Sequence, residues 1–441
     1  MSLQDAHGYA QAGEYAKAWP IVSGFINEEP DNPVALNIAC YMLERQGNAG
    51  LAYNIAKRLS DRHPSAPVAW VNLGKTCDTL WRMEEAENAY RRALTQVKAG
   101  DSDTKLTIFC NLSALQLQLG NFKQAEKYAD QALQVDPSHL KSRHNKGICL
   151  LARGAWSDGW KQYEASVGSP QRIAYQYNNE PTWKGEPGTV VVFGEQGIGD
   201  EICAASMIPD AIKRARVIID CDARLETLFR RSFPEAKVYG TRSAKVLNWA
   251  EEDQAIDYSI PSMQMGALFR NEAQDFPGTP YLKADPDRVL MWKALWASKK
   301  KPVFGIAWTG GLKETASQYR QWGPEELKAI TGLDATWVSL QYKDTETPEN
   351  VLRFAETTSK NYDDTAALVA SLDGVVAMQS TAVHIAGALG IPCAAGIPKT
   401  SQWRYGEAGD AMPWYRCVRL FRQEKLGDWS KAIQGIQGWL K

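Results

Sequence analysis

Three glycines and two carboxylates are concentrated between Gly194 and Asp200, in the order Gly-Glu-Gln-Gly-Ile-Gly-Asp. Four apolar residues, Val190–Phe193, precede this segment, and a helix-like run follows it. A strand, a tight loop and a helix N-terminus in this order allow backbone N–H groups to approach an anion or a sugar. Asp200 then stands at the mouth of the loop, where a carboxylate can accept a proton. The other residues expected to line this loop are Glu195, Gln196, Gly197 and Gly199.

A second segment with the same order of elements begins at the strand-like run Gly374–Met378. Gln379, Ser380 and Thr381 follow it, and Ser and Thr are residue types that cap helix N-termini. Small residues come next, so this helix can lie close to a ligand. Its free N–H groups and the positive end of its dipole suit a pyrophosphate. His384 is the only histidine after residue 144, and we expect it to contact the same ligand.

Each of these features also has a purely structural interpretation. Asp200 can simply cap a helix, and a lone histidine such as His384 is often a satisfied structural residue. The glycine spacing matches neither the dinucleotide fingerprint nor the P-loop. Asp220-Cys221-Asp222 has the D-x-D form of a metal motif, but it directly follows Val217–Ile219. We therefore interpret it as the end of a strand and expect no metal site.

Strand-like and helix-like segments alternate in the second part of the chain, which predicts parallel sheets with crossover helices. A segment rich in Pro, Gly, Asn and Gln precedes these alternating elements, and this composition predicts a connector with little regular structure. The expected divisions are a linker over 169–188, a Rossmann-like lobe over 189–285, a second over 301–425, and a C-terminal helix over 426–441, with a bridge between the lobes from Tyr281 to Lys301.

An internal repeat occupies the first part of the chain. Gly13 and Ala18 recur as Gly47 and Ala52, 34 residues later, and Ala86 follows Ala52 by another 34. This period, with small residues at fixed places, resembles the tetratricopeptide repeat, in which each unit is two antiparallel helices. We expect a solenoid of four to five repeats over 1–168, the last one degenerate. Its groove is expected either to bind a peptide or acceptor or to serve only as a scaffold or dimerisation arm.

Composition narrows the classes of function. The 441 residues carry a net charge of −1, which gives no support for nucleic acid as a partner. No apolar run is long enough to span a bilayer, and the first residues do not have the pattern of a secretory signal. The eight cysteines form no C-x-x-C pair. We therefore expect a cytoplasmic protein whose cysteines are reduced.

Taken together, these segments resemble tetratricopeptide-repeat glycosyltransferases whose catalytic region is related to the lipopolysaccharide heptosyltransferases. The resemblance covers nearly the whole chain. Its specific pieces are Pro181-x-Trp183-x-Gly185-Glu186, the Gly194–Asp200 loop, Gly305–Trp308, Trp337–Gln341, the Thr381–Gly390 helix and Arg419–Gln423.

That resemblance implies the GT-B fold, with two facing Rossmann-like lobes. The acceptor is expected on the first lobe, the nucleotide sugar on the second, and the C-terminal helix packed back on the first lobe. Asp200 then matches the carboxylate placed as general base. The residues expected to contact the donor are Trp308, Arg320, Gln341, Gln379, Ser380, Thr381 and His384. Heptosyltransferases usually have Asp at the position of Gln379, so the donor sugar is left open.

The predicted activity is an inverting, metal-independent transfer of a sugar from a nucleotide-diphosphate sugar to a hydroxyl of a glycan or lipid-linked acceptor, with no other cofactor. Asp200 would remove the proton, and Arg320 and the helix at Thr381 would stabilise the leaving diphosphate. Two alternatives remain. The solenoid could thread a polypeptide acceptor, as in protein O-glycosyltransferases, or the chain could be a non-catalytic scaffold with a vestigial nucleotide-sugar pocket.

Overall fold

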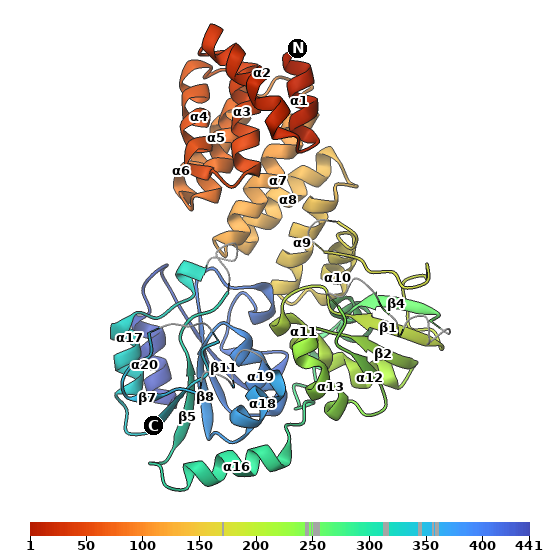
Figure 1. Cartoon of the computed structure of the whole chain (residues 1–441), viewed down its shortest axis with the longest axis vertical. Helices are drawn as coiled ribbons and strands as arrows, with labels where there is room; N and C mark the ends of the chain where they lie inside the picture. Colours follow the sequence, from red (N-terminus) through yellow and green to blue (C-terminus); the bar gives the residue numbers. More distant parts are fainter. Residues whose placement is uncertain are drawn as a thin grey trace. The chain divides into compact units, whose positions relative to one another are not determined.

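The computed structural model describes residues 1–169, 172–242, 247, 249, 256–311, 317–342, 346–354, 357 and 361–441. The chain forms two compact units, Met1–Lys146 and Gly147–Lys441. Among the described residues, no helix combines the length and the apolar character needed to cross a membrane. The first unit is entirely helical, whereas the second contains two sheets (Figure 1).

The first unit consists of antiparallel helix pairs, which confirms the predicted repeat. Its helices are α1 (Leu3–Gln11), α2 (Tyr15–Glu28), α3 (Pro33–Arg45), α4 (Ala49–Arg62), α5 (Pro67–Thr79), α6 (Met83–Gln96), α7 (Ser102–Gln118) and α8 (Phe122–Val135). The repeated alanines Ala18, Ala52, Ala86 and Ala125 are fully buried in the second helices of their pairs. A larger side chain at these positions would force the paired helices apart.

The repeated glycines stand where one helix of a pair ends and the next begins. Gly13, Gly47 and Gly120 have φ angles of 77°, 77° and 71°, which glycine adopts without a steric penalty. The third pair has Trp81 at this position, 34 residues after Gly47, and Trp81 adopts a φ of 59°. The turn geometry of the repeat is therefore preserved where its usual residue is missing.

A fifth helix pair follows, with α9 (Leu140–Ala152) and α10 (Trp156–Glu164). It corresponds to the degenerate repeat, but α10 belongs to the second compact unit, whereas the repeat region was expected to extend to residue 168. The Trp160 indole is fully buried and donates to the Arg270 carbonyl at 2.8 Å, and its ring packs against Gly266. This apolar and hydrogen-bonded contact attaches α10 to the α/β region.

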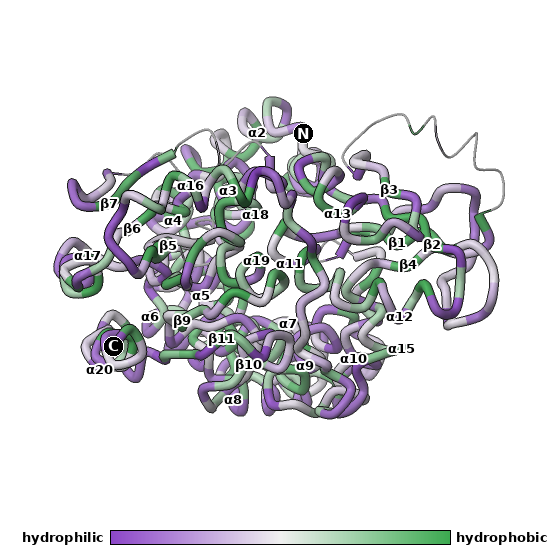
Figure 2. The backbone as a smooth tube through the Cα atoms, turned by 90° about the horizontal axis from the view of Figure 1, so that it is seen from below, coloured by the Kyte–Doolittle hydropathy of each residue, from purple (hydrophilic) through white to green (hydrophobic). Residues whose placement is uncertain are grey.

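The first sheet has four parallel strands in the order β3-β2-β1-β4. Its elements are β1 (Thr189–Phe193), α11 (Ile198–Ala204), α12 (Ile208–Ile212), β2 (Arg216–Asp220), α13 (Glu226–Ser232), β3 (Lys237–Tyr239), β4 (Tyr258–Pro261) and α15 (Gly266–Phe269). Short 3₁₀ helices are η1 (Ala205–Met207), η2 (Ala223–Leu225), η3 (Ser262–Met265) and η4 (Ala273–Asp275). Every residue of β1 is buried, as a central parallel strand requires, and the apolar character of β1 and β2 is visible in Figure 2.

The second sheet has seven strands in the order β10-β11-β9-β8-β5-β6-β7, parallel except for β10. Its strands are β5 (Val303–Ala307), β6 (Thr336–Ser339), β7 (Val351–Leu352), β8 (Gly374–Met378), β9 (Cys393–Ile397), β10 (Ala411–Met412) and β11 (Tyr415–Arg422). Its helices are α17 (Pro324–Thr331), α18 (Tyr362–Ala370), α19 (Thr381–Leu389) and α20 (Ser430–Trp439), with η6 (Ser317–Tyr319) and η8 (Trp403–Tyr405). Helices α17 and α20 cover one face and α18 and α19 the other (Figure 1).

The C-terminal helix differs from its expected position. We predicted that it would pack back on the first lobe, but α20 packs on the second sheet against β11, β9 and α17. Its apolar residues Ile433 and Ile436 join the core cluster that contains Trp322 and Trp337. Burial of this stripe against its own sheet accounts for the position of the helix.

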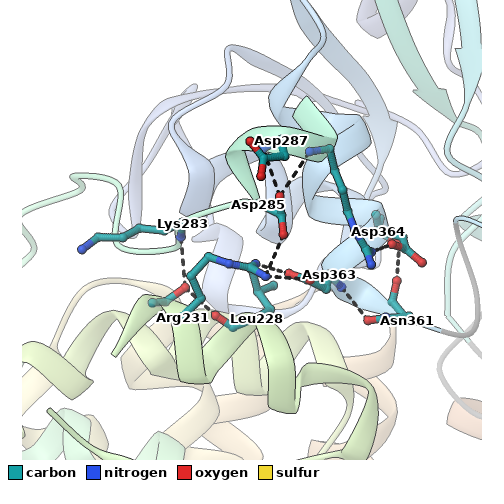
Figure 3. Close-up of polar contacts among 11 residues, drawn as sticks. Leu228, Arg231, Lys283, Asp285, Asp287, Asn361, Asp363 and Asp364 are labelled. Carbon is teal, nitrogen blue, oxygen red and sulfur yellow. Dashed lines mark hydrogen bonds and ion pairs between the residues drawn. The ribbon is translucent and has the colours of Figure 1, made fainter. Parts of the chain in front are cut away.

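A cluster of ion pairs joins the two sheet regions at α16 (Pro286–Trp296), the helix that connects them. Arg231 on α13 points toward Asp363 at the start of α18 and toward Asp285, which caps α16 (Figure 3). Its Nη2 lies 2.9 Å from Asp363 Oδ2 and 3.3 Å from Asp285 Oδ2. Asp363 is almost fully buried, so its charge depends on this guanidinium.

We predict that Arg231→Met lowers the free energy of unfolding by about 1–3 kcal/mol, because it leaves a buried carboxylate without its cation. The matched control is Arg288→Met, since Arg288 pairs with Asp364 where both side chains are more than one third exposed. Arg288→Met should lower the free energy of unfolding by less than about 1 kcal/mol. Thermal unfolding followed by tryptophan fluorescence measures the stability of both variants. Equal losses of stability would contradict the expectation that the buried ion pair contributes more than the exposed one.

Candidate functional site

The glycine loop connects β1 to α11, as predicted, and Asp200 lies in the first turn of this helix. Asp200 Oδ2 accepts from the Gly197 amide at 3.0 Å. Gly194 is required by close packing, because a Cβ atom there would overlap the Glu201 carboxylate. Burial raises the pKa of Glu201 to about 8, although the guanidinium of Arg242 lies 2.9 Å from it and opposes this shift. Gly197 is thus the N-cap residue of α11, whereas Asp200 was expected there; Asp200 instead closes the first turn from the third helical position, and its second carboxylate oxygen, Oδ1, is directed elsewhere.

The corresponding turn after β5 lies against the start of α19. Gly310 approaches Gln379 and Ser380 so closely that a side chain there would overlap the Gln379 carbonyl. Gln341 fixes this turn, because its Oε1 accepts from the Trp308 and Thr309 amides at 3.1 and 3.2 Å. The Gln341 side chain therefore binds the backbone of the turn, which is a structural contact.

Helices α11 and α19 lie side by side, one from each sheet (Figure 2). A Cβ atom on Gly199 would lie 3.1 Å from His384 Cδ2 and 3.5 Å from Thr381 Oγ1. The glycine at position 199 therefore permits the close approach of the two helices. This contact brings Asp200, Thr381 and His384 into one region, although they are almost 200 residues apart in the sequence.

His384 is buried between two tyrosines. Its Nε2 lies 3.1 Å from the Tyr405 hydroxyl and its Nδ1 lies 3.2 Å from the Tyr415 hydroxyl. Burial, reinforced by the nearby charge of Arg404, lowers the pKa of His384 to about 3. A neutral imidazole in this position holds η8 and β11 against α19. Both ring nitrogens already face hydroxyl groups, so this geometry favours a structural role over direct ligand contact.

Arg404 forms the contact that links the two halves of the site. It lies on η8, is buried, and makes an ion pair with Asp200 Oδ1. Burial opposes the charge on Arg404, but Asp200, together with Cys203, Tyr163 and Tyr405, outweighs that effect, and the pKa of Arg404 is raised. The segment Trp403–Tyr405 concentrates aromatic and basic residues, yet nothing in the sequence pairs Arg404 with Asp200, which is why sequence reasoning missed it.

Arg320 is a second buried guanidinium in the same region. Its Nη2 lies 3.2 Å from the Gln379 side-chain oxygen, in the amide orientation that satisfies both residues. Burial, together with repulsion from Arg404, lowers the pKa of Arg320 to about 10, so it is still charged at neutral pH. Among the described residues, no carboxylate forms an ion pair with Arg320.

Several buried donors around these two arginines have no hydrogen-bond partner within the described part of the chain. They are Arg320 Nε, Arg404 Nε and Ser380 Oγ, and the Asp200 Oδ1 acceptor likewise makes no hydrogen bond there. Buried polar groups in native proteins are normally satisfied, so unpartnered donors gathered at a helix N-terminus indicate a place for an acceptor-rich ligand. The α19 segment thus combines a helix N-terminus with two cations.

The other predicted loop residues make structural contacts. Glu195 forms a fully buried, two-bond ion pair with Arg172, whose Nε and Nη2 lie 2.8 and 2.5 Å from its oxygens. The Gln196 amide donates to the Tyr163 hydroxyl at 3.0 Å. Arg172 also stacks on the Tyr163 ring at 4.0 Å. These contacts fix the glycine loop to α10, and they engage Glu195 fully.

A narrow pocket opens beside α19 at the carboxyl ends of β5 and β6. Its lining includes Thr309, Tyr342, Tyr362, Ser380 and Thr381. Ligands of parallel α/β sheets bind at this edge. Trp308, expected in the donor site, instead places its ring in the hydrophobic core with Trp322 and Trp337.

A larger cavity of about 420 Å³ lies elsewhere in this unit, beside Arg270, Phe276 and Trp414. Arg270 there is already paired with Asp210 at 2.9 Å. Size alone does not make this cavity the site, because Arg320, which has no carboxylate partner within the described part of the chain, and Asp200 lie near the start of α19.

The Asp220-Cys221-Asp222 segment lies at the end of β2, as predicted. Asp220 accepts from the Tyr177 hydroxyl at 2.8 Å, and Asp222 pairs with Arg224 at 2.9 Å. Among the described residues, no three His, Cys, Asp or Glu side chains are arranged to hold a metal ion.

Comparison with known proteins identifies the repeats. A family model described as tetratricopeptide repeat matches residues 69–138, and a second with the same description matches residues 112–171. The chain therefore contains tetratricopeptide repeats, followed by an α/β region with parallel strands.

Two proteins and one solved structure show the similarity of this chain to known sequences and folds. Protein FlbA of Caulobacter vibrioides is 27% identical over 436 residues, which cover 90% of this chain and 71% of the relative. Trafficking protein particle complex subunit 12 of Mus musculus is 32% identical over 68 residues, 15% of this chain and 8% of that protein. The structure of Pseudomonas aeruginosa pilF is 16% identical, with a TM-score of 0.35, and the match covers 38% of this chain and 75% of that one.

The buried His384 predicts a specific pH dependence. The folded state resists protonation down to a pKa of about 3, whereas the unfolded chain accepts a proton near pH 6.5. The contribution of His384 to stability is therefore complete above pH 6.5 and is lost as the pH falls below that value. The loss is up to about 1.4 kcal/mol of unfolding free energy for each pH unit. We expect His384→Gln to flatten the stability profile between pH 6.5 and 5.

Urea unfolding at several pH values measures this difference, and subtraction of the variant from the wild type removes the contributions of carboxylates. His7→Gln, which changes an exposed histidine of α1, is the control and should leave the profile as it is. Parallel profiles for wild type and His384→Gln would show that the imidazole does not resist protonation.

Proposed function

We propose that this protein is an inverting glycosyltransferase that uses a nucleotide-diphosphate sugar. The observation that carries the proposal is the pair of buried guanidiniums, Arg320 and Arg404, with unpartnered donors at the N-terminus of α19. A diphosphate supplies the acceptor oxygens and the negative charge that this region lacks. Asp200 lies beside Arg404, where an acceptor hydroxyl would meet the sugar.

In this proposal the two sheets are the lobes of a GT-B fold. The nucleotide would lie on the second lobe, with its diphosphate at α19. The pocket beside Tyr342 and Tyr362 has a volume of about 20 Å³, which is too small for a nucleoside. The glycine loop of the first lobe would face the acceptor. The close contact of α11 and α19 supports this pairing of lobes.

The proposed reaction is a single displacement. The Asp200 carboxylate takes the proton of the acceptor hydroxyl while the oxygen attacks the anomeric carbon. The bond between that carbon and the diphosphate oxygen breaks, and its electron pair leaves with the nucleoside diphosphate. Arg320, Arg404 and the α19 N-terminus stabilise the charge that develops on the leaving group. Attack opposite the leaving group inverts the configuration of the sugar.

A second candidate, in which the acceptor is a polypeptide, is favoured by a groove in the repeat unit. The first helices of successive pairs line a pocket of about 300 Å³. Asn72 donates to Asn37 there at 2.6 Å, and both side chains can bond a peptide backbone. Tetratricopeptide repeats are suited to protein interaction, so the groove would hold the acceptor chain or a protein partner.

Arg320→Ala should weaken the binding of a nucleoside diphosphate by about 1.5–3 kcal/mol, because it removes a charge-assisted contact. Calorimetric titration with UDP, GDP and ADP measures this and also identifies the preferred base. The control is Arg419→Ala, which removes an exposed arginine of the same sheet region. Equal affinity in wild type and Arg320→Ala would exclude Arg320 from the donor site.

Asp200→Asn should reduce sugar transfer by about 100-fold or more while nucleotide binding persists, since asparagine still caps α11 but cannot take the proton. Incubation of a lysate with radiolabelled nucleotide sugars measures transfer, and the labelled product separates a protein acceptor from a glycan or lipid acceptor. Asp275→Asn, a change at another capping carboxylate, is the control. Nucleotide binding without transfer by the wild type would indicate the non-catalytic scaffold instead.

A further inference from the structure

We infer that Arg404 is a cation shared between Asp200 and the donor diphosphate, so that binding of the diphosphate releases the base for catalysis. The inference rests on the proposed function and adds an order to it: the donor must bind before Asp200 can accept a proton. It concerns a residue that lies outside the predicted site, on η8.

Both oxygens of Asp200 are engaged in the structure. Oδ2 accepts from the Gly197 amide at 3.0 Å, and Oδ1 forms an ion pair with Arg404 Nη2 without a hydrogen bond from any described residue. The first contact belongs to the cap of α11 and is needed to keep the loop in place. Only Oδ1 can therefore be offered to an acceptor hydroxyl, and Arg404 must move away from it first.

The backbone that carries Arg404 is fixed, whereas its guanidinium retains unused donor capacity. Arg422 donates to the carbonyls of Tyr405, Gly406 and Gly409, and Tyr405 is held by His384. Among the described residues, Arg404 Nε has no hydrogen-bond partner. A small rotation of the side chain can therefore exchange one anion for another without a change in the fold.

Charge favours this exchange when a diphosphate arrives. Arg320 and Arg404 repel each other, since Arg404 contributes to the lowered pKa of Arg320. One carboxylate cannot balance two buried guanidiniums and a helix N-terminus, whereas a diphosphate can contact all three. Asp200 and the diphosphate then compete for Arg404, and removal of the carboxylate should strengthen diphosphate binding.

The test is a double-mutant cycle on the full chain, with inorganic pyrophosphate as the ligand and calorimetry as the readout. We expect Asp200→Asn to bind pyrophosphate about 5-fold more tightly than the wild type, or better, because Arg404 no longer pairs with a carboxylate. Arg404→Gln should bind about 10-fold more weakly. In the Arg404→Gln background, Asp200→Asn should change affinity by less than about 2-fold.

Asp275→Asn is the matched control, since Asp275 makes the same capping contact at η4, to the Glu272 amide at 2.9 Å. It should leave pyrophosphate affinity unchanged. If Arg404→Gln unfolds, Arg404→Lys, which keeps the charge but loses the fork of donors, replaces it in the cycle. A Kd for Asp200→Asn equal to that of the wild type, with Arg320→Ala still weakened, would overturn the shared-cation inference alone. Absence of pyrophosphate binding by the wild type would overturn the proposed function as well.

Discussion

Excess positive charge at the N-terminus of α19 is the constraint on which the site depends. Two guanidiniums, each about 5% exposed, lie beside a helix N-terminus that already carries partial positive charge. Burial of unpaired charge costs several kcal/mol, so such an arrangement persists only where an anion offsets it. In the structure Asp200, which comes from the other sheet region, is this anion for Arg404, whereas no carboxylate among the described residues pairs with Arg320. The ion pair is therefore one of the contacts that join the two sheet regions at this point.

Several contacts hold this charge cluster in place. Two of them depend on glycines, and two depend on side chains that bond a turn or a neighbouring element. Gly199 and Gly310 permit close approaches that any side chain would prevent or strain. Gln341 fixes the turn after β5 through two amides, and His384 holds η8 through Tyr405. Because His384 resists protonation, this support carries no additional positive charge. The support from His384 is thus neutral, and Arg320, Arg404 and Asp200 are the charged groups that it surrounds.

Local patterns in the sequence predicted much of the fold. The 34-residue period predicted the helix pairs, and strand-like apolar runs predicted β1, β2 and β8. Strands β9 and β11 were missed because Cys393–Ile397 is short and rich in alanine and Tyr415–Arg422 is interrupted by arginines. The position of α20 was wrong because the choice between two apolar surfaces depends on packing, which its own sequence does not specify.

The candidate site could be predicted only in part, because local motifs mark some of its residues and packing decides the others. Asp200, Thr381 and His384 are marked by local motifs, and the structure brings them together. Glu195, Gln196 and Gln341 stand in those motifs but make structural contacts, and the Trp308 ring enters the core. Arg404 could not be assigned from the sequence, since its importance comes from a partner about 200 residues away. A pairing of this kind appears only when the two sheets are placed against each other.

A crystal structure of the protein grown with UDP or ADP tests the central claim most directly, because it locates the anion that balances the charge at α19. The account predicts diphosphate oxygens in contact with the Arg320 and Arg404 guanidiniums and with the first amides of α19, and an Asp200 Oδ1 that Arg404 has released. A nucleotide bound elsewhere, with the Arg404–Asp200 ion pair intact and Arg320 without an anion, would contradict it.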